Sequence, residues 1–182
     1  MSNLILVDEH DNEVGTAEKM VAHTRGILHR AFSIFIFRQQ DNNIQVLLQK
    51  RHINKYHSGG LWTNSCCGHP EVKENIISAG ERRINEELGI KVELFELGSF
   101  IYKNQFSNGL IEHELDHVLV GIYQNDAIIP NPGEVDDFKW ENILEFELWL
   151  LEPTNEFTVW LQPAWHIIKN NFDKVKELLE RY

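Results

Sequence analysis

A spaced segment between Gly68 and Gly89 constrains the fold of this chain more than any other part of its sequence. Within it, Glu74 follows Gly68 after five residues and Arg82 follows Glu74 after seven. The segment closes on two glutamates, a leucine and Gly89, and glycine is the residue that most often ends a helix in the left-handed conformation. Its apolar residues recur at helical spacing, which predicts a helix with a buried stripe formed by Ile76, Ile77, Gly80, Ile84 and Leu88.

The charged residues of this predicted helix indicate a site for a divalent cation. Glu87 and Arg83 lie one helical turn apart and therefore share a face beside the apolar stripe. A pair of glutamates alone would indicate only a solvated helix face with Arg–Glu ion pairs. The full spacing from Gly68 is far more specific and resembles the Nudix box, in which a loop and a helix bring carboxylates together on a metal ion.

One position departs from that box, because the chain has Arg82-Arg83 where the box normally has arginine followed by glutamate. A carboxylate that would bind metal has thus become a cation. A hydrolase that uses Mg2+ at this glutamate to activate water would be impaired, whereas a site that holds a diphosphate could use Arg83 as a counter-charge. The box therefore predicts the fold more strongly than it predicts hydrolysis.

Imidazoles and carboxylates outside the box form a second candidate metal site. The pair Glu112 and Glu114 lies in a segment with the pattern of a strand, so both side chains project from the same face. No sequence spacing joins this pair to the histidines. From the residues alone, each could equally be a surface or hydrogen-bonded group, and the candidate ligands are His23, His29, His69, Glu112 and Glu114.

Cys67 is the candidate reactive thiol, because it lies two residues before His69. Its neighbour Cys66 would point to the opposite side of a strand or tight loop, and a free cysteine is commonly a small buried apolar residue. That alternative also holds for Cys67, just as Tyr102 could simply lie at the edge of the core.

Taken together, these residues resemble a type 1 isopentenyl-diphosphate delta-isomerase of the Nudix superfamily. The Arg82-Arg83 pair is itself similar to these isomerases. The resemblance extends almost from end to end of the chain and rests on Glu18-Lys19, Ala22-His23-Thr24, the run from His29 to Ser33, Arg51 with Lys55, the run from Thr63 to Pro70, Tyr102, Glu112 with Glu114, and a tryptophan near the C-terminus.

The resemblance implies an enzyme that moves a carbon–carbon double bond, interconverting isopentenyl and dimethylallyl diphosphate in isoprenoid biosynthesis. Cys67 and Glu114 would be the proton-transfer residues on opposite sides of the substrate, and Tyr102 would assist Glu114. The reaction passes through a tertiary carbocation, which an aromatic face stabilises while it excludes water. Trp165 would provide that face, with Trp62 as a second possibility.

The resemblance also implies two metal ions and a cationic diphosphate site. His23, His29, His69, Glu112 and Glu114 would surround one divalent ion, and such a nitrogen and oxygen shell suits Mn2+, Fe2+ or Zn2+ better than Ca2+. Glu87 would help to hold Mg2+ on the substrate diphosphate. The cationic partners of the diphosphate would be Lys19, Arg51, Lys55 and Arg83, although Lys19 and Lys55 could be solvated charges.

The composition restricts the partners and the compartment. Residues 1–182, with 42% hydrophobic content, suit a single Nudix-type isomerase domain. The net charge of −11 argues against nucleic acid, so a small diphosphate must bind through a local cluster of cations and metal ions. We expect no membrane span and no secretory signal, and the adjacent cysteines favour a reducing compartment, the cytoplasm. The sequence does not indicate an oligomeric state.

Alternating strand and helix patterns predict an α+β fold, a mixed β-sheet flanked by helices. Beside the box helix, we expect helices over Ile143 to Leu151 and over Pro163 to Leu179. The expected strands are Leu4 to Val7, Ala31 to Phe37, Ile44 to Gln49, a strand near Phe100, Leu115 to Tyr123, and Phe138 to Trp140.

Two other functions are compatible with this fold. A Nudix hydrolase acting on a nucleoside diphosphate derivative would share it, but Arg83 and Cys67 argue against that activity. A silent binding module would keep the fold and lose the chemistry, yet Cys67, Tyr102 and Glu114 are all present.

Overall fold

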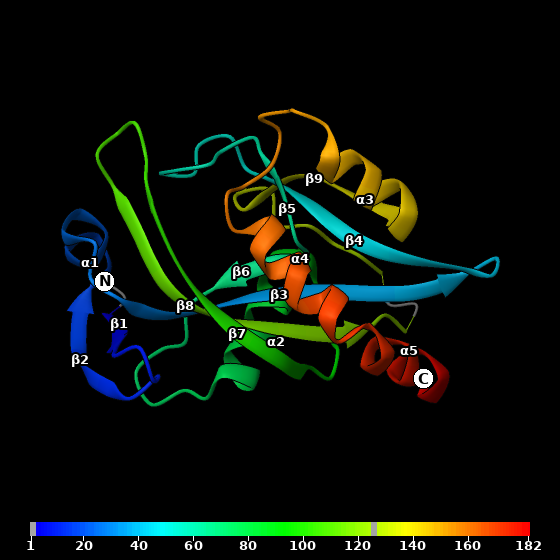
Figure 1. Ribbon diagram of the computed structural model, residues 1–182, viewed down its shortest axis with the longest axis horizontal. Helices are drawn as coiled ribbons and strands as arrows, with labels where there is room; N and C mark the ends of the chain where they lie inside the picture. The colour runs from blue at the N-terminus through cyan, green and yellow to red at the C-terminus, as the bar shows by residue number, and fades with distance from the viewer. Residues whose placement is uncertain (1–2, 125–126) are drawn as a thin grey trace.

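The computed structural model describes residues 3–124 and 127–182, whose strands form one mixed β-sheet around a long central strand (Figure 1). That strand, β3, pairs antiparallel with β1, β4 and β6 and parallel with β8. Strand β7 extends the sheet beyond β8, and β9 pairs with β4. The strands are β1 (Asn3–Val7), β2 (Glu13–Glu18), β3 (His29–Gln40), β4 (Asn43–Arg51), β5 (Trp62–Thr63), β6 (Cys66–Gly68), β7 (Phe95–Gln105), β8 (Ile111–Ile122) and β9 (Val135–Asn142).

The helices cover both faces of this sheet, because β3 is apolar on both sides. Phe35 and Phe37 pack with residues of the helices α3, α4 and α5, whereas Ile34 and Ile36 pack with α2 on the other face. This alternation is what a strand with two buried faces requires. The helices are α1 (Lys19–Arg25), α2 (Ile76–Leu88), α3 (Ile143–Leu151), α4 (Leu161–Asn170) and α5 (Phe172–Arg181).

Helix α2 is the helix that the box spacing predicts, and its two ends follow known capping rules. The side chain of Asn75 accepts a hydrogen bond from the Ser78 backbone N–H at 2.9 Å, and Gly89 adopts a left-handed φ of 69° after the last turn. Gly80 lets the helix approach the sheet, since a Cβ there would lie 2.8 Å from the Leu119 side chain. Helix α2 therefore holds the buried Glu87 against the sheet, where Gln49 of β4 donates a hydrogen bond to it.

The α+β arrangement predicted from the sequence is confirmed, but one helix prediction is wrong. The expected single helix over Pro163 to Leu179 is interrupted, because Asn171 leaves the helical conformation with φ −119° and ψ 20°. Its side-chain amide donates to the Ile167 carbonyl at 2.9 Å. Asparagine side chains compete in this way for backbone groups, so α4 and α5 are separate helices.

None of the described helices is long and apolar enough to cross a membrane.

Candidate active site

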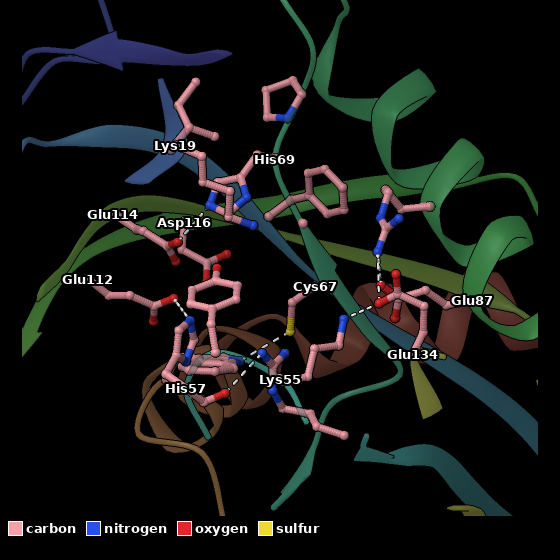
Figure 2. Close-up of a pocket in the computed structure, with 18 of the residues that line it drawn as sticks. Lys19, Lys55, His57, Cys67, His69, Glu87, Glu112, Glu114, Asp116 and Glu134 are labelled. Carbon is pink, nitrogen blue, oxygen red and sulfur yellow. Dashed lines mark hydrogen bonds and ion pairs between the residues drawn. The ribbon is translucent and has the colours of Figure 1, made fainter. Parts of the chain in front are cut away.

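One cavity of about 630 Å³ lies where α1, β6, α2 and the β7–β8 hairpin meet. Figure 2 shows the carboxylates of β8 on one side of Cys67, and Glu87 with Glu134 on the other. Most of the residues singled out in the sequence line this cavity, namely Lys19, Arg51, Lys55, Cys67, His69, Arg83, Glu87, Tyr102, Glu112 and Glu114.

Strand register explains how segments that are distant in the sequence meet on the side of the cavity that carries the β8 carboxylates. His29 of β3 lies directly opposite Glu114 of β8, and Glu114 lies opposite Tyr102 of β7. Residues opposite each other in a sheet share a face, so these three side chains form a row across the three strands. His69 reaches the row from the segment after β6, and its Nε2 lies 2.8 Å from Glu114 Oε1.

His23, His29, His69 and Glu114 form a compact group, with one potential ligand atom from each within 4.8 Å of all the others. His23 Nε2 and His29 Nε2 are 3.3 Å apart. The Nδ1–H of His29 donates to the Ile27 carbonyl at 2.8 Å, so Nε2 is the ring nitrogen that faces the group. Four donors of this kind, three nitrogens and one oxygen, suit a transition metal ion.

The pKa values within this group shift in both directions. For His29, burial acts to lower the pKa, but the hydrogen bond to Glu114 and the charge of Glu114 raise it above its ordinary value. Burial lowers the pKa of His23 to about 3 and that of His69 to about 4, so both rings are neutral at pH 7. Burial alone would raise the pKa of Glu114, but hydrogen bonds from His29 and His69 lower it well below the ordinary range. His23 Nδ1 is buried and has no hydrogen-bond partner in the part of the chain that the structure describes. The residues present therefore fit a divalent cation.

Glu112, also proposed as a ligand, does not belong to this group of four. Its Oε2 accepts from the Tyr102 hydroxyl at 2.7 Å, and its Oε1 lies 2.6 Å from His57 Nε2. The same hydroxyl lies 2.6 Å from Glu114 Oε2, so Tyr102 bridges the two carboxylates. Burial raises the pKa of Tyr102 well above its usual range, which keeps this hydroxyl protonated as a donor.

His57 and Asp116 are among the cavity residues that escaped the sequence reasoning. His57 is 6% exposed and stacks on Phe106 with ring centroids 4.6 Å apart, but it lies in a polar loop with no recognisable spacing. Asp116 is buried, and its Oδ2 accepts from Ser33 Oγ at 2.8 Å. Burial, and then the charge of Glu114, raise the pKa of Asp116 well above its ordinary range. The sequence did carry a signal for Asp116, because it follows Glu112 and Glu114 at the same two-residue spacing and therefore lies on the same face of the strand.

The two cysteines point in opposite directions, as the sequence predicts. Cys66 is fully buried in the core between the sheet and α2, whereas Cys67 is partly buried and lines the cavity. Burial raises the pKa of Cys67 to about 12, although the nearby Arg51 acts in the other direction. The side chain is therefore a neutral thiol at pH 7.

The prediction that Trp165 covers the site is wrong. Trp165 packs in the core against Phe146, with ring centroids 4.8 Å apart, and is not among the residues that line the cavity. Trp160, five residues earlier, lines it instead and donates its Nε1–H to Cys67 Sγ at 3.2 Å. Trp160 immediately precedes α4 and Trp165 lies within that helix, which explains why the two rings reach different environments. Trp62, the other tryptophan considered, is also absent from the cavity lining.

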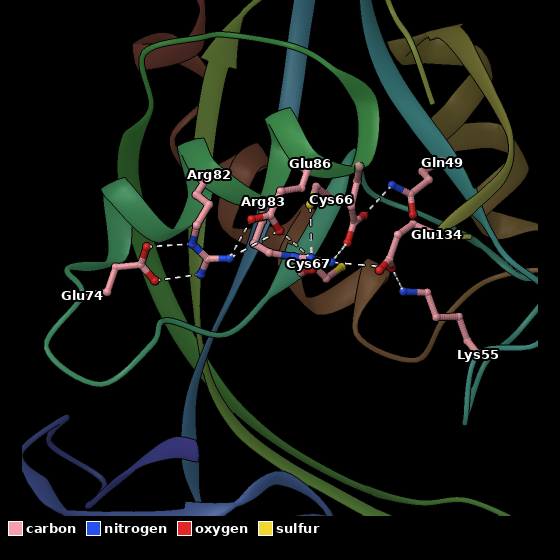
Figure 3. Close-up of polar contacts among 10 residues, drawn as sticks. Gln49, Lys55, Cys66, Cys67, Glu74, Arg82, Arg83, Glu86 and Glu134 are labelled. Carbon is pink, nitrogen blue, oxygen red and sulfur yellow. Dashed lines mark hydrogen bonds and ion pairs between the residues drawn. The ribbon is translucent and has the colours of Figure 1, made fainter. Parts of the chain in front are cut away.

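Ion pairs organise the opposite side of the cavity (Figure 3). Arg82 holds Glu74 with two hydrogen bonds of 2.8 Å, and Arg83 pairs with Glu87. Glu87 also accepts from Gln49 Nε2 at 2.9 Å, so this buried carboxylate is fixed from two directions.

Cations complete that side. Lys55 forms an ion pair with Glu134, which also lies 3.6 Å from Arg83. Lys19 lies on the other side of the cavity, near His69 and Glu114 (Figure 2). Its ammonium group lies 4.7 Å from the centre of the Tyr56 ring, and burial lowers its pKa although the charge of Glu114 acts in the other direction. The cavity thus combines a nitrogen and oxygen metal site, a neutral thiol and a cationic region.

Known proteins resemble the chain in both sequence and fold. The family model of the NUDIX domain matches residues 27–161. The chain is 49% identical over 159 residues to isopentenyl-diphosphate Delta-isomerase 2 of Photorhabdus laumondii, a match that covers 87% of this chain and 88% of that protein. It is 48% identical over 158 residues to the protein of the same name from Aromatoleum aromaticum, with 87% and 82% covered.

Solved structures agree on the fold at much lower sequence identity. A crystal structure from Deinococcus radiodurans matches with a TM-score of 0.71 and 16% identity, covering 91% of this chain and 98% of that one. The MutT protein from Methanosarcina mazei matches with a TM-score of 0.61 and 17% identity, covering 79% and 95%.

Proposed function

Because the chain belongs to the isopentenyl-diphosphate Delta-isomerase family of NUDIX-domain proteins, we propose that it interconverts isopentenyl and dimethylallyl diphosphate in isoprenoid biosynthesis. The observation that carries this proposal is one cavity in which the Cys67 thiol and the Tyr102–Glu114 pair project from different strands. Moving a double bond by one carbon needs a proton added to one carbon and another removed from a different carbon. Two separate proton-transfer groups in one cavity meet that need.

Cys67 and Glu114 are the proton-transfer residues, and Tyr102 assists Glu114. At pH 7 the thiol is protonated and the carboxylate is ionised, so one group can donate while the other accepts. The reverse reaction exchanges the two roles. The hydroxyl of Tyr102, held on both Glu112 and Glu114, supplies a proton relay and fixes the reacting carboxylate.

The carbocation between the two steps must be kept from water. Trp160 takes the role first expected of Trp165, since its ring lines the cavity beside Cys67. An aromatic face attracts a cation by about 0.5 to 2 kcal/mol and excludes solvent at the same time.

Divalent metal fits two places in this site. His23, His29, His69 and Glu114 would hold one ion, for which the donor set favours Mn2+ or Zn2+. Glu112 is joined to Glu114 through the Tyr102 hydroxyl and would be a further ligand. Glu87 would contribute to a Mg2+ site for the diphosphate. Bound metal would polarise the Glu114 carboxyl group at one end and neutralise phosphate charge at the other.

The diphosphate binds to the cations of this cavity. All four of the expected partners line it, namely Arg51, Arg83, Lys19 and Lys55. This local charge offsets the net charge of −11, which repels anions at longer range. The two free cysteines suit a reducing compartment, and we place the enzyme in the cytoplasm.

Proton NMR of isopentenyl diphosphate with the purified protein, Mg2+ and Mn2+ in D2O tests the proposal. We expect dimethylallyl diphosphate that carries deuterium in a methyl group. The Cys67→Ala variant should form product about 10²- to 10⁴-fold more slowly, while a hydrolase that relies on metal and Glu87 would be almost unaffected. Release of inorganic phosphate or diphosphate would establish hydrolysis instead, and an unchanged spectrum would contradict the isomerase assignment.

A further inference from the structure

A fully buried amide, that of Asn64, lies behind the reactive thiol in the turn that joins β5 to β6. Its Nδ2 donates to the Ile34 carbonyl at 3.1 Å and to the Cys66 carbonyl at 2.6 Å. Carbonyl oxygens only accept, so the nitrogen of the amide must face them. The amide oxygen is therefore directed to the opposite side, and the orientation of the group is unambiguous.

That oxygen faces two groups that can donate a proton. Cys67 Sγ lies 3.1 Å from Asn64 Oδ1, and the hydroxyl of Thr63 lies 2.8 Å from the same atom. Thr63 is held in turn by the hydroxyl of Thr158 at 2.9 Å. An amide oxygen has two lone pairs and can accept both hydrogen bonds.

The other neighbour of the sulfur decides where the thiol proton points. The indole Nε1–H of Trp160 can only donate, so sulfur is the acceptor in that 3.2 Å contact. Asn64 Oδ1 can only accept, so sulfur is the donor in the second contact. The thiol is thereby held from two sides, by one donor and one acceptor.

We propose that Asn64 is a positioning residue for the proposed isomerisation, which orients the Cys67 thiol by accepting a hydrogen bond from it. The effect of Asn64 on the reaction rate rests on the proposed function, whereas the hydrogen bond between Asn64 and the thiol does not. Because the amide is fixed to the backbone of β3 and β6, the sulfur cannot turn away from the cavity without losing this hydrogen bond. Loss of the acceptor would free the side chain to sample other rotamers, and misplacement of a reacting group by about 1 Å can reduce a rate by about a hundredfold.

The test compares Asn64→Ala with Ser65→Ala, a matched control from the same turn. Ser65 is also fully buried, and its hydroxyl donates to the Leu47 carbonyl at 2.7 Å and accepts from the Ile36 N–H at 2.8 Å. Both variants remove buried hydrogen bonds from the same turn, but no hydrogen bond joins the Ser65 side chain to Cys67 among the described residues. A merely structural role of Asn64 would therefore make the two variants behave alike.

The first readout is the infrared S–H stretching band of Cys67, assigned as the difference between the unmodified protein and Cys67→Ala. We expect the band of a hydrogen-bonded thiol, which should shift to the frequency of a free thiol in Asn64→Ala and stay in place in Ser65→Ala. A free-thiol frequency in the unmodified protein would overturn the proposal, and this measurement needs no Asn64 variant that folds. It is also independent of whether the protein is an isomerase.

The second readout is the isomerisation rate. We expect kcat to fall by up to about a hundredfold in Asn64→Ala with KM changed less than about twofold. Ser65→Ala should keep kcat within about threefold of the unmodified enzyme. Equal losses of kcat in the two variants, or an unchanged kcat in Asn64→Ala, would refute the positioning role.

Discussion

Trp160 and Trp165 offer a matched test of the proposed active site, because replacing either by phenylalanine removes the same atoms. Both side chains are 3% exposed, so each substitution disturbs a buried ring. Only Trp160 lines the cavity and contacts Cys67, whereas Trp165 packs against Phe146 in the core. The two variants should therefore lose similar stability and very different activity.

The expected magnitudes follow from these contacts. Trp160→Phe removes the hydrogen bond to sulfur, worth about 0.5 to 1.5 kcal/mol, and part of a cation–π attraction of about 0.5 to 2 kcal/mol. A loss of about 1.4 to 2.7 kcal/mol in the transition state lowers kcat by about 10- to 100-fold. For Trp165→Phe we expect about 1 to 2 kcal/mol of lost stability, well below the 3 to 5 kcal/mol of a truncation to alanine. That corresponds to a fall in Tm of about 2 to 8 °C for a chain of this size.

The assays are kcat for isopentenyl diphosphate by proton NMR and Tm by circular dichroism. Trp165→Phe should retain kcat within about threefold at a temperature well below its Tm. If Trp165→Phe lost 10-fold or more while Trp160→Phe kept its activity, the assignment of the aromatic cover to Trp160 would be refuted.

Three further predictions follow from the site. Cys67→Ala should lower kcat by about 10²- to 10⁴-fold, the usual contribution of an acid–base group. Its affinity for the diphosphate substrate, measured by calorimetry, should stay within about threefold of the unmodified protein. A kcat within about tenfold of the unmodified protein would contradict the proton-transfer role of Cys67. His29→Gln should reduce the amount of divalent metal that the protein retains after dialysis, measured by elemental analysis. In the unmodified protein, metal at a hundred times its Kd should raise the free energy of unfolding by about 2.7 kcal/mol, or Tm by about 5 to 11 °C. Equal metal content in the two proteins and no effect of a chelator on Tm would exclude the site. The hydrogen bonds from Arg82 lower the pKa of Glu74 below its ordinary value of about 4.3, so their stabilisation, about 1 kcal/mol, should be present above that pH and disappear as pH falls through the lowered pKa. Urea unfolding of Glu74→Gln should accordingly differ from the unmodified protein at pH 7 and converge with it in acid, and a constant difference would show that the charge of Glu74 is irrelevant.

Local patterns determined much of the fold. The spacing from Gly68 to Gly89 predicted α2 and its left-handed end, and the Nudix fold that it indicated is confirmed by the family match and by solved structures. Helix α3 has the predicted bounds, Ile143–Leu151. Short elements were missed where such patterns are weak, as in β2, which is mostly exposed, and in the seven-residue helix α1.

The sequence alone also determined which chemical groups the site would contain, because a thiol, imidazoles, carboxylates and cations are properties of residues and their spacing. Only tertiary structure decided which of them meet. The parallel pairing of β3 with β8 brings His29 opposite Glu114, although 85 positions of the chain separate them, and no local rule specifies that register. Likewise, the packing of α4 decided the places of the two tryptophans. Trp165 lies on the face of the helix that packs in the core, whereas Trp160 precedes the helix and contacts Cys67.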